Sequence, residues 1–297
     1  MVALPGRPEQ AMAEKLYQSV VKSRAKKMTL TRLGASSIGE ECLRKTFYGW
    51  RRYSLRPPDG RMSLLFESGD IYEKRAIENL RLIGLTIWDK DPATGKQYYW
   101  AHPSGHFVVN PDGVCRGVLL DEKTPHILEV KSHNDRNFRN LENRTVVKSH
   151  PEHYIQMQME MHGFGLDWAL YVGVNKNDDA YYFERVPYDQ GTVDSINRKI
   201  DTLVAATLTP AGVSQTASAP PCKYCYHKRV CVGDEAPLRH CLTCRNVQAI
   251  ANPESKYGDW HCNFHNKLLS YGDQLKGCDF YDSTQESHPL GAYLQSG

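Results

Sequence analysis

A glutamate and a lysine stand two residues apart in a segment, 126–132, that reads as a β-strand. Because side chains alternate across a strand, Glu129 and Lys131 share one face, and their apolar neighbours point into the core. A carboxylate beside a lysine suits metal-assisted hydrolysis of a phosphodiester: the acid holds a divalent cation, and the lysine orients water or stabilises charge on the phosphate. One carboxylate does not hold Mg²⁺ tightly, so a second is required, and Asp112 in a turn one strand earlier is the obvious candidate.

Two other interpretations of this spacing stay open at this point. A Glu-x-Lys spacing occurs about once by chance in a chain of this length, and the bland interpretation is a cross-strand ion pair on the surface. Asp121 and Lys123 offer a similar spacing nearby, but Pro125 marks a hairpin turn in which their side chains would be solvated. Motifs elsewhere in the chain are therefore needed to distinguish a catalytic pair from a surface ion pair.

The elements that would position these residues follow a mixed α/β pattern. The sequence predicts helices over 9–27, 37–53, 63–83, 151–161 and 189–208. It predicts strands over 97–100, 105–110, 113–120, 126–132, 168–175 and 180–187. Ser37 and Glu40 have the spacing of a capping box at the start of the second helix, and Gly163 is the expected stop of the fourth.

Composition limits the class of protein. With 297 residues, 40% hydrophobic and 24% charged, the chain is long and apolar enough for a sizeable core, which excludes wholesale disorder. Its longest apolar run is about six residues, far short of the roughly 20 that span a bilayer, so we expect no membrane helix. Pro5 and Pro8 interrupt the region where a signal peptide needs an apolar core, so we expect a cytoplasmic location. The net charge of +3 is compatible with nucleic-acid binding without requiring it.

The nine cysteines favour bound metal over disulfides, because their number is odd and the last seven crowd into one stretch with two Cys-x-x-Cys pairs. Two groupings are open. One joins Cys42 to the cysteines at 222, 225 and 231 and makes a second set at 241, 244, 262 and 278, leaving Cys115 as a small buried residue. The other is a zinc ribbon at 222, 225, 241 and 244, which leaves Cys42 and Cys231 without partners. The first uses eight cysteines and is favoured.

Three motifs in combination resemble the PD-(D/E)XK nuclease superfamily. Asp112, sixteen further residues and then Glu129-Val130-Lys131 resemble its catalytic signature. Gly69 and Glu73 resemble the Gly-x-x-x-(His/Glu) motif of the RecB-like branch. Tyr154, Gln156 and Gln158 resemble the Gln motif of that branch, which often reads Gln-x-x-x-Tyr; here Glu160 follows Gln156 and His162 follows Gln158. The resemblance covers about residues 36–231.

This resemblance implies a fold and a metal site. The fold is α/β, a restriction-endonuclease-like αβββαβ core with N-terminal helices and a C-terminal cysteine-rich metal-binding module. Glu73, Asp112 and Glu129, with the carbonyl of Val130, would bind Mg²⁺ or Mn²⁺, and Lys131 would act on the attacking water. Tyr154, Gln156 and Gln158 would face DNA. The expected organisation is a helical segment (1–35), a nuclease core (36–208), a linker (209–221), a cysteine segment (222–231) and a zinc module (232–297).

The cysteines extend the resemblance to iron–sulfur RecB-like exonucleases, including CRISPR-associated enzymes and phage relatives. One cysteine before the core and three after it resemble the four ligands of a [4Fe–4S] cluster. Those ligands would be Cys42, Cys222, Cys225 and Cys231. The remaining set would form a Cys₄ zinc site, in which His261 or His265 is an alternative ligand. That set is Cys241, Cys244, Cys262 and Cys278.

Basic and aromatic residues alternate between Arg44 and Arg56, with no acid among them. Arginines that contact phosphate beside aromatic rings are typical of single-strand binding, so Arg44 and Arg51 are expected to contact DNA. The rings of Phe47 and Trp50 are expected to be buried.

The sequence thus predicts a metal-dependent DNA exonuclease that hydrolyses phosphodiester bonds of single-stranded or end-resected DNA in recombination, repair or replication. The resemblance implies phage or mobile-element origin, action in a host cytoplasm, and a single-strand-binding or annealing protein as a partner. One alternative is a non-catalytic nucleic-acid-binding protein that uses the nuclease scaffold and zinc module for recruitment. A processing nuclease acting on RNA is a further alternative.

Overall fold

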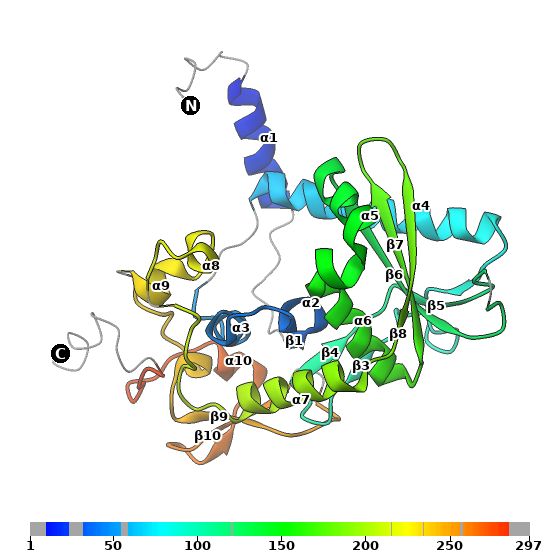
Figure 1. The fold of residues 1–297 in the computed structure, drawn as a ribbon. Coiled ribbons are helices and arrows are strands. Elements are labelled where there is room, and N and C mark those ends of the chain that lie inside the picture. The colour runs from blue at the N-terminus through cyan, green and yellow to red at the C-terminus, as the bar shows by residue number, and fades with distance from the viewer. Residues whose placement is uncertain are drawn as a thin grey trace.

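A five-stranded mixed sheet lies at the centre of the α/β half of the chain, with strand order β2-β5-β6-β7-β8 (Figure 1). The structure is a computed structural model and describes residues 10–23, 32–54, 59–119, 121–214, 216–233, 235–255 and 258–284. The strands are β2 (Thr86–Trp88), β5 (Gly113–Arg116), β6 (His126–His133), β7 (Trp168–Asn175) and β8 (Tyr181–Pro187). β6 and β7 run parallel, and the other neighbouring pairs run antiparallel.

Helices pack on both faces of this sheet. They are α4 (Gly60–Leu82) on one face, and α5 (Asp135–Ser149) and α6 (Pro151–Phe164) on the other. Leu128 and Val130 of β6 pack in one apolar cluster with Ala76 and Leu80 of α4. On the opposite face Ile127 of β6 packs with residues of α5 and α6. Since helices cover both faces, polar side chains of β6 are buried as well as apolar ones.

Along the chain the core follows the order α4, β2, β5, β6, α5–α6, β7, which is the helix, three strands, helix, strand order that the sequence predicts. The segments 97–100 and 105–110, however, contribute to a separate sheet with order β1-β4-β3. Its strands are β1 (Leu33–Gly34), β3 (Trp100–Ala101) and β4 (Phe107–Val109). The first core strand is β2, which has three residues with Ile87 alone buried, too few to give a periodic signal.

The sequence predicts one helix over 37–53, and the structure has two. They are α2 (Ala35–Ile38) and α3 (Leu43–Trp50). The capping-box prediction is wrong: Ser37 Oγ donates to a carbonyl of its own turn, and Cys42 precedes α3 without a side-chain cap. The helix α2 ends at Gly39 and packs on α6, where a Cβ on this glycine would lie 3.1 Å from Cα of Glu152.

The helix α5 has no counterpart in the prediction, because its few apolar residues give a weak periodic signal. Thr145 interrupts it with φ 64° and ψ 164°, and the backbone N–H of Val146 donates to the carboxylate of Glu184 at 2.8 Å. The next helix, α6, continues past the predicted stop at Gly163 and ends at Gly165, whose φ of 62° is left-handed.

The tail has more regular structure than the sequence indicates, since it contains an antiparallel sheet of order β11-β10-β9. In Figure 1 the orange and red tail lies against α3 and α7. None of the described helices is long and apolar enough to cross a membrane. Residues 24–27 of the first predicted helix lie outside the described residues. The further elements are α1 (Gln10–Ser23), α7 (Gln190–Ala205), α8 (Pro220–Lys223), α9 (Lys228–Val232), the 3₁₀ helix η1 (Cys241–Thr243), β9 (Val247–Ile250), β10 (Asp259–Cys262), β11 (Lys267–Leu268) and α10 (Tyr271–Gln274).

Candidate functional site

Glu129 and Lys131 lie on the face of β6 that α6 covers, with side chains pairing as carboxylate and ammonium. Glu129 is completely buried, whereas 28% of the Lys131 side chain is exposed. A fully buried carboxylate is not part of a solvated surface ion pair, so that interpretation is wrong. The lysine instead bridges the interior of the sheet and the solvent.

Asp112 directly precedes β5, and the register of the sheet brings it to the same place. Gly113 pairs with Leu128, so the aspartate lies beside the middle of β6. Its Oδ2 accepts a hydrogen bond from the backbone N–H of Val130 at 2.8 Å. This bond fixes the carboxylate at the strand that carries Glu129 and Lys131.

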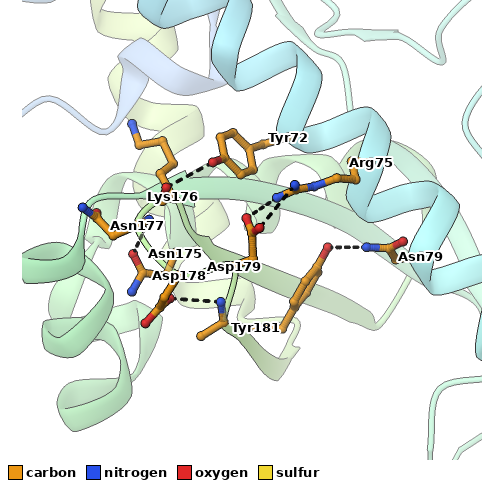
Figure 2. Close-up of polar contacts among 10 residues, drawn as sticks. Tyr72, Arg75, Asn79, Asn175, Lys176, Asn177, Asp178, Asp179 and Tyr181 are labelled. Atoms are coloured by element: carbon orange, nitrogen blue, oxygen red, sulfur yellow. Dashed lines mark hydrogen bonds and ion pairs between the residues drawn. The ribbon is translucent and has the colours of Figure 1, made fainter.

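Glu73 reaches the site from α4, and the turn between β7 and β8 holds that helix in position. Figure 2 shows three contacts between the turn region and successive turns of α4. They are Tyr72 Oη donating to the Lys176 carbonyl at 3.1 Å, the ion pair of Arg75 with Asp179, and Asn79 Nδ2 donating to Tyr181 Oη at 2.8 Å.

Burial is the largest cause of the raised pKa values of these acids. Burial and the charge of Asp112 raise the pKa of Glu129 to about 8 and that of Glu73 to about 7. Burial likewise raises the pKa of Asp112. Burial alone would lower the pKa of Lys131, but the carboxylates of Glu129 and Asp112 raise it above its usual value. The lysine is therefore charged at neutral pH, and the site lacks positive charge relative to its carboxylates.

Glu160 of α6 joins this group, although no motif marked it as a site residue. Its Oε1 accepts from Gln156 Nε2 at 3.0 Å, and its side chain is completely buried. Burial, followed by the charge of Glu129, raises its pKa well above the ordinary value. The available signal was its position four residues after Gln156, which puts both side chains on one face of a helix.

The donor set fits a hard divalent cation. Carboxylate oxygens are the ligands that Mg²⁺ and Mn²⁺ prefer. Oε2 of Glu129 and Oε2 of Glu160 are buried and have no hydrogen-bond partner among the described residues, and a cation would satisfy such atoms. Within that same part of the chain no three His, Cys, Asp or Glu side chains are arranged so that they could hold a metal ion. The support for a cation here is therefore the type of donor atom and the burial of the unpaired oxygens, and it is not a ready-made arrangement of three ligands among the described residues.

The residues expected to face DNA on α6 have separate environments. Gln156 is directed to Glu160 and belongs to the acidic site. Gln158 is fully buried, and its amide donates to the Pro187 carbonyl at 2.8 Å and accepts from the Asp189 N–H at 2.7 Å. Tyr154 is half-buried, and its hydroxyl lies 3.5 Å from the Asp189 carboxylate. Gln158 thus ties α6 to the end of β8.

The two arginines expected to contact DNA make contacts within the protein. Arg51 is completely buried, and its guanidinium stands 5.0 Å from the ring centroid of Trp260. Arg44 is half-buried and donates to the Pro210 carbonyl at 2.8 Å and to Cys231 Sγ at 3.6 Å. Phe47 and Trp50 are buried, as expected. The carbonyls that accept from Arg51 are those of Ala206, Leu242 and Val247, at 3.1, 3.3 and 3.2 Å.

Eight cysteines line two small cavities. One, of about 20 Å³, is lined by Cys42, Cys222, Cys225 and Cys231 together with Arg44 and Lys45. The other, of about 10 Å³, is lined by Cys241, Cys244, Cys262 and Cys278. These are the two sets of the eight-cysteine grouping, and neither is the zinc-ribbon set. All nine cysteines are free, and Cys115 is buried in β5, where burial raises its pKa to about 12.

Three histidines form a cluster with Tyr171, and the charge of Lys131 acts on two of them, His133 and His153. Tyr171 Oη shares hydrogen bonds with His133 Nε2 at 2.8 Å and His153 Nδ1 at 2.9 Å. The ring of His150 stacks on that of His153, with centroids 5.0 Å apart. Burial and nearby positive charge lower the pKa of His133 to about 4 and that of His153 to about 2. These two imidazoles are therefore neutral at physiological pH and add no charge beside the lysine.

No protein family matches the sequence, and no curated protein matches it either. Among solved structures, the chain is similar to LHK-Exo, an alkaline exonuclease from Laribacter hongkongensis, with 17% identity and a TM-score of 0.42 over 64% of this chain and 90% of that one. A complex of LHK-Exo with dAMP gives the same values. The structure of SSO0001 has 13% identity and a TM-score of 0.41 over 78% of this chain and 100% of that one.

Proposed function

We propose that the chain is a divalent-metal-dependent DNA exonuclease with a PD-(D/E)XK active site. The observation that carries this is the completely buried Glu129, paired with Lys131 on one strand face and accompanied by Asp112 on the neighbouring strand. Burying a carboxylate costs free energy of folding. Such groups cluster at functional sites, where a cation or a reaction uses their charge. Glu73 on the preceding helix completes the acidic set of that superfamily.

The cation would be Mg²⁺ or Mn²⁺, held by Glu73, Asp112 and Glu129 with the carbonyl of Val130. When bound, it supplies Lewis-acid stabilisation of the negative charge that develops on the phosphate. The hydrogen bond from Val130 N–H to Asp112 supports this assignment, because it keeps a ligating carboxylate and the strand backbone together.

Lys131 would orient the water that attacks phosphorus and donate a hydrogen bond to a phosphate oxygen. Its ammonium stays charged because carboxylates surround it, and its partial exposure leaves room for a phosphate. As water adds, the bond from phosphorus to the 3′ oxygen breaks, and that oxygen takes up a proton.

Two further metal centres are part of the proposal. A [4Fe–4S] cluster on Cys42, Cys222, Cys225 and Cys231 is supported by their common cavity and by Arg44 and Lys45 beside it, since a cluster with four thiolates is anionic. Zinc on Cys241, Cys244, Cys262 and Cys278 is supported by two sulfurs that accept backbone N–H groups. These are Cys244 Sγ from Asp282 and Cys262 Sγ from His265, both at 3.5 Å.

The substrate would be single-stranded or resected DNA ends, in recombination, repair or replication. The test is degradation of DNA labelled at the 5′ or the 3′ end, single- or double-stranded, with Mn²⁺ and with EDTA. We expect Mn²⁺-dependent loss of nucleotides from one end, abolished by EDTA and by Lys131→Ala. Binding without cleavage would favour the recruitment protein, and cleavage of an RNA oligomer alone would favour the processing nuclease.

A further inference from the structure

We propose that Glu160 is an additional carboxylate of the cation site, so that four acidic side chains, rather than the three of the motif, serve the divalent metal. This inference rests on the proposed function, because it adds a residue to the same site. It concerns a position where the resembled motif often has tyrosine, a residue with no charge to offer a cation at neutral pH.

The position of Glu160 on α6 supports this role. Gln156 and Glu160 are one turn apart, so they lie on the same face of the helix. The helix α6 packs on β6, the strand of Glu129, and after burial the charge of Glu129 has the largest effect on the pKa of Glu160. Gln158, which lies between Gln156 and Glu160 in the sequence, makes its contacts at the end of β8 instead. The acidic face of α6 and the acidic face of β6 therefore meet.

The hydrogen bonding of Glu160 is incomplete. The side chain is completely buried; Oε1 accepts from Gln156, and Oε2 has no partner among the described residues. A buried carboxylate oxygen without a donor costs free energy, and such groups normally have a partner or a bound ion. Oε2 of Glu129 lacks a hydrogen-bond partner in the same way.

The charge balance points in the same direction. With all groups ionised, four carboxylates and the ammonium of Lys131 carry a formal charge of −3. The four acids are Glu73, Asp112, Glu129 and Glu160. One divalent cation reduces this to −1, so the fourth carboxylate strengthens cation binding at the expense of the metal-free protein. The opposed effects on metal affinity and on metal-free stability make the inference testable.

The competing role is structural, in which Glu160 only orients Gln156 through their hydrogen bond. The change Glu160→Gln separates the two roles, because glutamine keeps the shape and an acceptor oxygen but removes the charge. Glu142→Gln is the matched control, since it makes the same chemical change at an exposed position of α5. Glu160→Asp keeps the charge and shortens the side chain, and it serves if the glutamine variant does not fold.

The experiment is calorimetric titration of the metal-free, full-length protein with Mn²⁺, without DNA. We expect the Kd for Mn²⁺ to rise by about tenfold or more in Glu160→Gln and to stay unchanged in Glu142→Gln. Metal-free Glu160→Gln should melt at a higher temperature than the wild type, because a repelling charge is gone. Glu160→Asp should also weaken Mn²⁺ binding, since its carboxylate is drawn back.

An unchanged Mn²⁺ affinity in Glu160→Gln overturns the inference, and so does a wild type that binds no Mn²⁺. Cleavage is measured separately on end-labelled DNA. Weaker Mn²⁺ binding in a protein that cleaves nothing leaves the inference standing and removes the proposed function. Efficient cleavage by the wild type, with an unchanged Mn²⁺ affinity in Glu160→Gln, keeps the proposed function and removes the inference about Glu160.

Discussion

Lys131 lies between the buried acids and the solvent. Its ammonium pairs with Glu129, while part of its side chain remains exposed. Removing it has two consequences, because the lysine both balances buried charge and, in the proposed chemistry, acts on water and phosphate. The two consequences are separable by adding metal, since a cation replaces the missing charge but not the hydrogen-bond donor.

Lys131→Ala should lower the cleavage rate at saturating Mn²⁺ by at least about a hundredfold, as loss of a donor to developing charge does elsewhere. The melting temperature of the metal-free variant should fall, because Glu129 is left buried without its partner, and Mn²⁺ should restore much of that loss. DNA affinity, measured by anisotropy in EDTA, should change little. Cleavage at the wild-type rate would remove Lys131 from the active site.

Site residues could be predicted where the local backbone sets their position, and could not where tertiary packing sets it. Strand alternation identified Glu129 and Lys131, because the backbone alone puts side chains two apart on one face. Glu160 was missed because its role depends on how α6 crosses β6, which local sequence does not encode. Arg51 resembled a DNA contact by composition, but its partners Leu242 and Val247 come from the distant tail and bury it.

Elements with a strong apolar pattern were predicted closely, and short or polar ones were not. The sequence gives β7 its observed limits of Trp168–Asn175, since this strand is an apolar run buried on both faces. It misses β2, which has three residues, and α5, which is mostly polar. The break between α2 and α3 follows Gly39, which lies close to α6, a tertiary contact that local sequence does not encode.

One junction between elements depends on a buried histidine. His106 directly precedes β4 and is completely buried between Trp50 of α3 and Trp260 of β10, with ring centroids 5.4 and 5.0 Å away. Its Nε2–H donates to the Ile250 carbonyl at 3.1 Å. Burial lowers its pKa to about 4, although Asp259 acts in the other direction.

This burial predicts a loss of stability in acid. The unfolded chain binds a proton near the ordinary pKa of about 6.5, and the folded chain does so only near 4, so stability is full above 6.5 and falls between 6.5 and 4. The difference between the two pKa values corresponds to roughly 3 kcal/mol, at most, in the free energy of unfolding. Urea unfolding at pH 7.5 and pH 5 should show a smaller pH effect in His106→Gln than in the wild type. Equal pH effects in the two proteins would show that His106 is not the group involved.

At the scale of the whole molecule, the cysteine-rich tail and the α/β half share one apolar core. Trp50 of α3 packs on Trp260 of β10, with ring centroids 4.9 Å apart, and Leu242 and Val247 belong to the same cluster as Ile200 of α7. Arg51 adds hydrogen bonds from α3 to tail carbonyls. The cysteine spacing alone indicates a self-contained zinc module, whereas this packing indicates a tail that completes the core.

Ending the chain after residue 235 should therefore destabilise the remaining α/β half. The deletion exposes Trp50 and leaves the buried guanidinium of Arg51 without two of its carbonyl acceptors. A buried donor left without an acceptor costs about 1 to 3 kcal/mol, and more when it is charged, against a total stability of about 5 to 15 kcal/mol. Melting and limited proteolysis of the two proteins measure the effect. A truncated protein that melts like the full chain would establish a separable module.

The four cysteines beside Arg44 connect parts of the molecule that are far apart in sequence. Cys42 immediately precedes α3, and Cys231 lies in α9, beyond the entire α/β core. The cavity that they line with Cys222 and Cys225 is small, and the cationic side chains of Arg44, Lys45 and Lys228 border it. A cluster bound there would close a loop around the core, and its binding energy would count as folding energy because the site does not exist in the unfolded chain.

The last prediction follows from that closure. Purified without oxygen, the protein should be brown, absorb broadly near about 400 nm and contain roughly four irons per chain, as a [4Fe–4S] cluster with four thiolate ligands requires. Cys42→Ala should remove the colour as completely as Cys231→Ala, while Cys115→Ala, which changes a cysteine buried in β5, should keep it. The melting temperature should fall with the iron content, and cleavage should weaken because α3 loses its attachment to α9. The zinc-ribbon grouping makes Cys42 a spectator and the protein colourless. A Cys42→Ala protein that stays brown with full iron would therefore rule out the cluster at this cavity.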